Sequence, residues 1–136
     1  MSKGETPVHR EEFRLPDLGE PISHYTDAVR FGNLLFISGI APTGADGKLV
    51  GGGDVVAQTE QIFINMKKIL DKAGAGFGDV LKVTVLLTDI ADRTKINPVR
   101  QRYFGTARPA STLFEVSALA IQGMKVEIEA VVGLPD

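Results

Sequence analysis

Apolar residues recur every three or four positions between Asp54 and Gly74. This spacing predicts an amphipathic helix, which Asp54 can cap at its first turn and which Gly74 can end. The polar residues of the segment are expected on the face opposite the apolar stripe: Gln58, Gln61, Asn65, Lys68 and Lys72. The apolar stripe must therefore pack against another element of the fold.

Shorter apolar runs predict strands on either side of this helix. Two of them flank Phe31-Gly32-Asn33 within residues 27–39, where glycine and asparagine can adopt the positive φ angles of a tight turn. A hairpin is expected there. Residues 80–88, VLKVTVLLT, are β-branched and almost continuously apolar, which is typical of a strand covered on at least one face.

A second helix and two further strands complete the pattern. Asn97 and Pro98 fit an N-cap followed by proline at the first helical position, and this helix is expected to run to Gly105. Residues 111–119 and 124–132 are typical of two strands joined by a short connection. The chain is therefore expected to close with a second hairpin.

The resulting order of two strands, helix, strand, helix and two strands predicts a two-layer α+β domain, in which one mixed sheet carries two helices on one face. Residues 25–136 are expected to form this single domain, preceded by a polar, partly extended N-terminal arm at residues 1–24. In the last strand Val126 and Ile128 point to one face, while Glu127 and Glu129 point to the other. The second face is therefore expected to be solvated or covered by another subunit.

Composition and charge narrow the range of functions. The 136 residues include 15 Lys and Arg against 17 Asp and Glu, so the net charge of −2 gives no general attraction to nucleic acids or anionic membranes. Neither partner is expected. The chain has no cysteine, which excludes zinc fingers and cysteine hydrolases. The first twenty residues contain no apolar run typical of a signal peptide or a membrane span, so cytoplasmic residence is expected.

The sequence contains no metal-binding, cofactor-binding or catalytic-triad motif. His9 and His24 are the only histidines, and their spacing is not that of metal ligands. Ser38 lies in Ile37-Ser38-Gly39 rather than in the G-x-S-x-G turn of a serine hydrolase. We expect no metal site and no cofactor.

The remaining polar candidates carry weak individual signals. Tyr25 also fits a core aromatic with its hydroxyl at the surface, Asn97 a helix cap, and Glu127 and Glu129 a solvated strand face. The segments around them, however, resemble the Rid (YjgF) family of reactive intermediate deaminases. The matching blocks are Tyr25 with FGNLLFISG at 31–39, VLKVTVLLTDI at 80–90, the Asn97 helix ending in YFG, and RPASTLFEVSAL at 108–119 with KVEIEAVV at 125–132.

This resemblance implies a fold and an activity. The fold is a chorismate mutase-like α+β fold assembled as a homotrimer, with three clefts that lie between neighbouring subunits. The activity is the hydrolysis of small enamines and imines, such as 2-aminoacrylate and its imine tautomer, to a keto acid and ammonia without metal or cofactor. A trimer would also cover the second face of the sheet.

The resemblance also implies roles for particular residues. Glu127 matches the strand glutamate associated with the attacking water, Tyr25 the tyrosine at the cleft mouth, and Asn97 the helix asparagine; these three are the catalytic candidates. Ser38 and Gly39 match the serine-glycine pair that contacts substrate. The other expected substrate-binding residues follow from the terminal signature: Arg108, Ser111, Thr112 and Leu113. Glu129 is expected to be structural.

One position departs from the family pattern. Ser111 stands where the best-known deaminases have an arginine that grips the substrate carboxylate. A serine cannot form a bidentate ion pair, and the loss of such a contact in a desolvated cleft costs about 2 to 5 kcal/mol of binding. We hypothesise that Arg108 or Arg102 partly substitutes for it.

Three functions follow from these observations. The first is a cofactor-independent deaminase whose substrate specificity is altered at Ser111, with an aminomuconate-type intermediate as one candidate substrate. The second is a non-catalytic trimer that binds a small metabolite or a regulatory partner in the same clefts. The third is RNA cleavage, which family names suggest, but which the negative net charge and the lack of a basic or aromatic strip disfavour.

Overall fold

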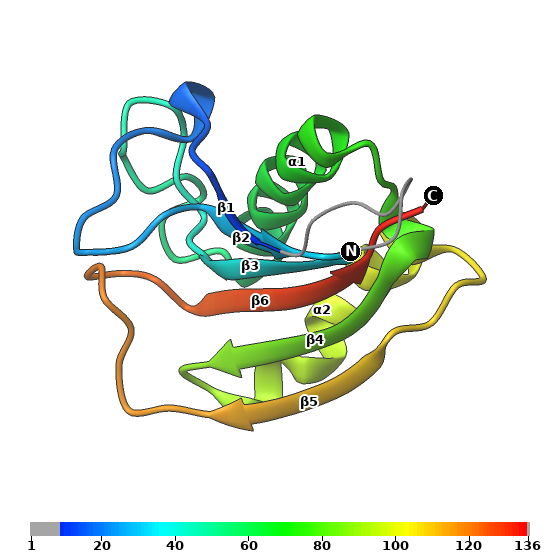
Figure 1. The fold of residues 1–136 in the computed structure, drawn as a ribbon. Helices are drawn as coiled ribbons and strands as arrows, with labels where there is room; N and C mark the ends of the chain where they lie inside the picture. The colour runs from blue at the N-terminus through cyan, green and yellow to red at the C-terminus, as the bar shows by residue number, and fades with distance from the viewer. Residues whose placement is uncertain (1–8, 136) are drawn as a thin grey trace, which may run out of the picture.

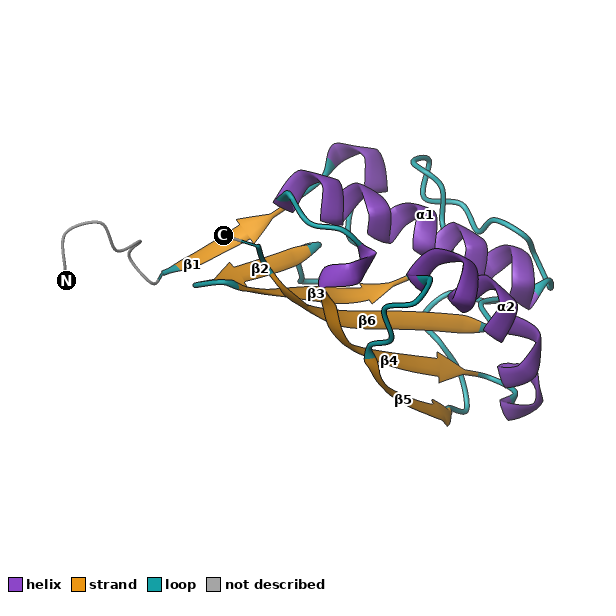
Figure 2. Ribbon diagram, turned by 90° about the vertical axis from the view of Figure 1, so that its right-hand side faces the viewer, coloured by secondary structure: helices purple, strands orange, loops and turns teal. Residues whose placement is uncertain are grey.

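The computed structural model describes residues 9–135 and confirms the two-layer α+β architecture, with both helices on the same face of one mixed sheet (Figures 1 and 2). The sheet has six strands in the order β1-β2-β3-β6-β4-β5. The strands are β1 (Arg10–Phe13), β2 (Ala28–Phe31), β3 (Leu34–Ile40), β4 (Val80–Leu87), β5 (Ala110–Glu115) and β6 (Val126–Gly133). The helices are α1 (Val55–Ala73) and α2 (Arg93–Phe104), with short 3-10 helices at η1 (Pro16–Leu18), η2 (Phe77–Asp79) and η3 (Ile90–Asp92).

The expected hairpin is strands β2 and β3. Phe31 pairs with Leu34 across the turn, and Gly32 has the positive φ angle of 63° that the turn requires. Helix α1 is likewise confirmed, because the Asp54 carboxylate accepts hydrogen bonds from the Val56 and Ala57 backbone N–H groups.

The expected closing hairpin is wrong. Strand β5 pairs only with β4, in parallel, whereas β6 lies between β3 and β4 and is antiparallel to both. The crossover through α2 places β5 on the outer edge of β4, so the chain must then pass β4 to reach the centre of the sheet. The last strand suits the centre because alternate side chains are fully enclosed, as Val126, Ile128 and Val132 show.

The expected start of the second helix is also wrong. Helix α2 begins at Arg93, so Asn97 is not its N-cap and Pro98 lies inside the helix. Two features favour the earlier start. Asp89 caps the preceding 3-10 helix η3, which runs directly into α2, and Ile96 anchors the first turns of α2 in the core. A proline this close to the helix start removes only one backbone hydrogen bond.

Two polar residues of α1 do not lie on its solvated face as expected. Gln58 is fully buried, and its amide donates to the Gly123 carbonyl and accepts from the Lys125 N–H. Asn65 is 4% exposed and donates to the Thr43 carbonyl over 2.9 Å. Buried amides are retained where they satisfy otherwise unpaired backbone groups. These two side chains therefore hold the loop at Thr43 and the loop at residues 123–125 against α1.

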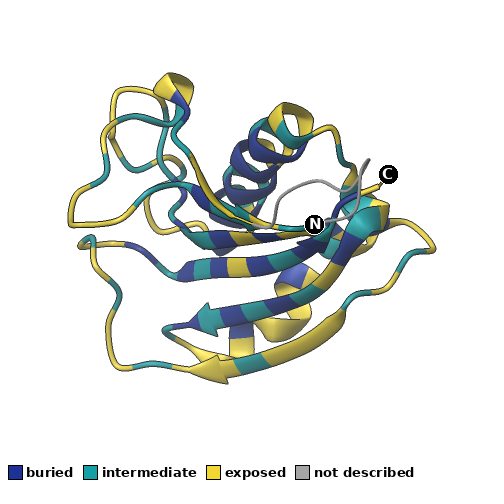
Figure 3. Ribbon diagram, in the orientation of Figure 1, coloured by how far each residue is buried: buried dark blue, intermediate teal, exposed yellow. Residues whose placement is uncertain are grey.

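The apolar core fills the space between the helices and one face of the sheet (Figure 3). It begins before Tyr25, because Leu15 is buried in it and the extended N-terminal segment adds β1 to the edge of the sheet. The opposite face is not covered by any other part of residues 9–135 and exposes large apolar side chains: Phe31, Leu34, Phe36, Leu81 and Phe114. No helix among residues 9–135 is long and apolar enough to cross a membrane.

Candidate functional site

A hollow at one end of the sheet brings four of the candidate residues together. Tyr25, Ser38, Gly39 and Glu127 line it, and they come from the loop before β2, from β3 and from β6. The remaining lining is mostly apolar: Ile22, Ser23, Ala41, Ala120, Ile121 and Met124. A single carboxylate thus faces a partly apolar space beside a phenol, which is an arrangement suited to proton transfer.

Glu127 occupies space that only a glycine leaves open. A Cβ atom at position 39 would lie 2.8 Å from the carboxyl carbon of Glu127. Burial raises the pKa of the Glu127 carboxyl above its usual range, and the negative charge of Glu129 raises it further. A glutamate with a raised pKa is better matched to taking up and returning protons near neutral pH than an ordinary surface glutamate.

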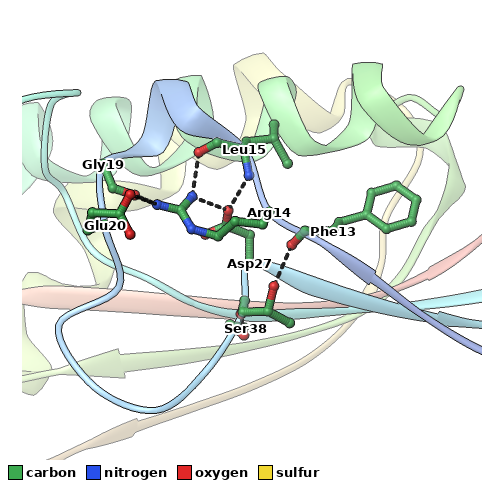
Figure 4. A network of polar contacts seen from close by, with 8 residues as sticks. Phe13, Arg14, Leu15, Gly19, Glu20, Asp27 and Ser38 are labelled. Carbon is green, nitrogen blue, oxygen red and sulfur yellow. Dashed lines mark hydrogen bonds and ion pairs between the residues drawn. The ribbon is translucent and has the colours of Figure 1, made fainter.

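Polar contacts from the N-terminal segment position the loop that carries Tyr25 (Figure 4). The carboxylate of Asp27 accepts from the Arg14 guanidinium over 2.9 Å and from the Leu15 N–H over 2.7 Å. Ser38 donates its hydroxyl proton to the Thr26 carbonyl over 2.6 Å. That proton is therefore already engaged, which leaves the Ser38 oxygen as a hydrogen-bond acceptor.

The loops that border the hollow are the two that Gln58 and Asn65 of α1 hold by hydrogen bonds. Asn65 binds the carbonyls of Ala41 and Thr43, and Gln58 binds the backbone of residues 123 and 125. Ala41 and Met124 lie in these loops and line the hollow. The buried amides of α1 thus shape the hollow, and Asn65 also lines the adjoining cavity with Tyr25 and Ser38.

Three other candidates lie in a second hollow between α2 and β5. Asn97, Arg108 and Ser111 line it, together with Arg100, which the sequence analysis did not identify. Arg100 donates from Nη2 to the Ser111 Oγ over 2.8 Å. Burial lowers the pKa of the Arg100 guanidinium from its usual value. Among residues 9–135, no residue lines both this hollow and the one that contains Glu127.

Three further candidates lie outside both hollows. The Thr112 hydroxyl accepts a hydrogen bond from the Lys82 ammonium, and Leu113 packs against the core. Arg102 forms an ion pair with Glu60 and lies over the Tyr103 ring. Of the two arginines considered as substitutes for the family arginine, only Arg108 lies near Ser111.

Arg100 had a weak signal in the sequence. It follows Asn97 by three residues, which places both side chains on the same face of a helix. Its contact with Ser111 depends on the packing of α2 against β5 and has no local sequence pattern.

Within residues 9–135, no three histidine, aspartate or glutamate side chains lie close enough together to hold a metal ion.

Comparison with known proteins identifies the family of this chain. Residues 17–133 match the family model described as Endoribonuclease L-PSP. A RutC family protein of Pyrococcus horikoshii is 42% identical over 112 residues, which cover 82% of this chain and 88% of that protein. The human protein named 2-iminobutanoate/2-iminopropanoate deaminase is 40% identical over 111 residues, which cover 81% of this chain and 80% of the human protein.

A solved structure of a Rid family protein has the same fold as this chain. The structure of the Rid family protein YyfA from Yersinia pestis has a TM-score of 0.86 at 33% identity, covering 93% of this chain and all of that one. The match to the family model spans nearly all the described residues and includes every candidate residue named above. This chain therefore belongs to the endoribonuclease L-PSP family, which is the Rid (YjgF) family that its sequence blocks resemble.

Proposed function

We propose that this protein hydrolyses reactive imines and enamines to a carbonyl compound and ammonia without a metal or cofactor. The observation that carries the proposal is the Glu127 carboxylate, which lies beside Tyr25 and Ser38 in a partly apolar hollow and has a raised pKa. Relatives with about 40% identity are named as deaminases of 2-iminobutanoate and 2-iminopropanoate, which supports this reaction class.

The chemistry requires little beyond placed proton donors and acceptors. Water adds to the electrophilic carbon of the protonated imine as Glu127 accepts one of the water protons, which forms a neutral carbinolamine. Glu127 then returns this proton to nitrogen, the carbon–nitrogen bond breaks, and the hydroxyl proton of the carbinolamine leaves with the ammonia, so protonated imine and water give carbonyl and ammonium in balance. The Tyr25 hydroxyl orients the water or the leaving amine, and positioning of this kind supplies much of the rate enhancement.

We also propose that the complete site lies between subunits of a homotrimer. Within residues 9–135 the hollow with Glu127 and the hollow with Asn97 share no lining residue, and in the proposed trimer a second copy brings the two hollows together. The exposed apolar side chains on the uncovered sheet face, such as Phe36 and Phe114, support self-association there.

Ser111 alters the substrate specificity in this proposal. Without the strand arginine, small 2-imino acids lose the carboxylate contact that β5 supplies in the family, so the carboxylate has to be held from another element and longer anionic imines become better substrates. An aminomuconate-type intermediate has these properties. A trimer that only binds such molecules, without turnover, is the alternative that the experiment distinguishes.

Ammonia release from freshly generated imines tests the proposal. The panel pairs small 2-imino acids with longer anionic imines, and each rate is compared with the spontaneous rate. We expect wild-type turnover, a loss of about 100-fold or more in Glu127→Gln, and retention in the matched control Glu129→Gln. Turnover at the spontaneous rate for every imine, with binding retained, would favour the non-catalytic trimer.

A further inference from the structure

Arg100 is one helical turn beyond Asn97 on α2, and its guanidinium reaches across to the β5 edge of the sheet. Nη2 donates to the Ser111 Oγ over 2.8 Å, and both residues line the second hollow with Asn97 and Arg108. A guanidinium has five N–H donors. Within residues 9–135, Ser111 accepts from one of them and no other residue accepts from the Arg100 guanidinium, so the remaining donors can bind a ligand.

Arg100 contacts a hydroxyl where Arg14 and Arg102 contact carboxylates. Within residues 9–135, the guanidinium of Arg14 pairs with Asp27 and that of Arg102 with Glu60, whereas no ion pair of Arg100 is formed. Burial nevertheless removes part of its hydration and lowers its pKa. A partly desolvated cation without a counter-charge favours binding of an anion.

We propose that Arg100 and Ser111 form an oxyanion subsite that binds the carboxylate of the substrate. This inference rests on the proposed function for the identity of the substrate, but the subsite itself rests on the geometry of the second hollow. Arg100 is then a specificity-determining residue, and it supplies from α2 a positive charge at the position where β5 carries serine.

The hydrogen-bond directions suit this role. Ser111 accepts from Arg100, so its own hydroxyl proton is available to donate to an anion. The guanidinium can present two parallel N–H groups to a carboxylate, which is the geometry of strong bidentate pairs. The Asn97 amide and the Arg108 guanidinium line the same hollow and add further donors.

Binding of a product-like acid, measured without turnover, tests the subsite. Isothermal titration calorimetry with 2-oxobutanoate and with its neutral methyl ester reports the contribution of the carboxylate. We expect the acid to bind wild type more tightly than the ester does. Arg100→Gln is expected to weaken binding of the acid by about tenfold or more and to leave ester binding unchanged. Arg100→Lys should keep part of the preference for the acid over the ester.

Two matched variants complete the experiment. Arg102→Gln removes a guanidinium that pairs with Glu60 outside the hollow, and it should leave binding of the acid unchanged. Arg108→Gln removes the other guanidinium of the hollow and should have the smaller effect. Unchanged acid binding in a folded Arg100→Gln protein, or a loss confined to Arg108→Gln, would overturn the proposal.

The two proposals fail in different ways. If the acid binds through Arg100 but no imine is turned over, the subsite stands and the deaminase assignment falls. If turnover depends on Glu127 but acid binding is indifferent to Arg100, the deaminase assignment stands and the subsite falls.

Discussion

Gly39 and Glu127 occupy one shared space, because a Cβ atom at position 39 would lie 2.8 Å from the Glu127 carboxyl carbon. Non-bonded Cβ atoms essentially never come this close to another heavy atom, so with a Cβ at position 39 the Glu127 side chain or the backbone of β3 would have to move. The glycine on β3 thus leaves room for the carboxylate on β6.

Gly39→Ala is therefore expected to displace Glu127 and to lower kcat/KM by about tenfold or more, because a displacement near 1 Å already misaligns a proton acceptor. A double-mutant cycle on the free energy of unfolding checks the cause. In a Glu127→Ala background the same change at residue 39 should cost less, with a coupling of about 0.5 to 3 kcal/mol. Additive effects would place the origin of the loss elsewhere.

The raised pKa of Glu127 predicts an acid limb in the pH profile of kcat/KM. The carboxylate must be ionised to accept a proton, so activity rises as pH passes upward through its pKa, which lies above the usual glutamate range. Glu129→Gln removes the charge that contributes to this shift and should move the limb to lower pH. A limb that stays in place in Glu129→Gln would show that Glu129 does not act on the titrating group.

The same pKa shift makes a prediction about stability. A carboxyl whose pKa is higher in the folded state favours folding when protonated, and this contribution is lost as pH rises through the folded pKa. Ionised Glu127 therefore opposes folding at neutral pH. Glu127→Gln should be more stable than wild type at pH 7, by less than about 1 kcal/mol because solvent screens the group. The difference, measured by chemical denaturation, should shrink as pH is lowered.

Gln58 provides a test of how the hollow is shaped from a distance. Its amide satisfies the Gly123 carbonyl and the Lys125 N–H, so Gln58→Leu leaves two backbone groups without their partner. We expect a loss of about 1 to 3 kcal/mol in the free energy of unfolding. Faster amide exchange around residues 120–125 should accompany it. The matched control Gln122→Leu changes an exposed side chain of the same loop, and an equal loss there would contradict the explanation.

The predictable parts of the fold are those with a local cause. Asp54 and Gly74 bound α1 because capping depends on neighbouring residues, and Gly32 fixes the hairpin for the same reason. The insertion of β6 between β3 and β4 depends on pairing between strands far apart in the sequence, so a short connection suggested a hairpin instead. Gln58 looked like a surface residue because its partners lie 65 and 67 positions away.

The candidate site, like the fold, was predictable only in the parts that have a local signal in the sequence. The family resemblance of short sequence blocks marked Tyr25, Ser38 and Glu127, and the structure brings them into one hollow. These blocks could not show that Asn97 and Ser111 lie in a different hollow, because that separation follows from the order of strands in the sheet. The contact from Arg100 to Ser111 joins a helix to a strand and has no sequence spacing of its own.

The uncovered face of the sheet predicts the link between assembly and activity. Phe36 is 47% exposed there, and a glutamate at this position would place a charge in any interface formed by that face. Phe36→Glu should give monomers in sedimentation analysis and should lose imine hydrolysis, because the hollows of Glu127 and Asn97 would no longer be joined. The control Val56→Glu changes a residue that is 40% exposed on α1, and it should remain assembled and active. A monomeric Phe36→Glu protein with full activity would show that one chain holds a complete site, and the split between the two hollows would then have no bearing on catalysis.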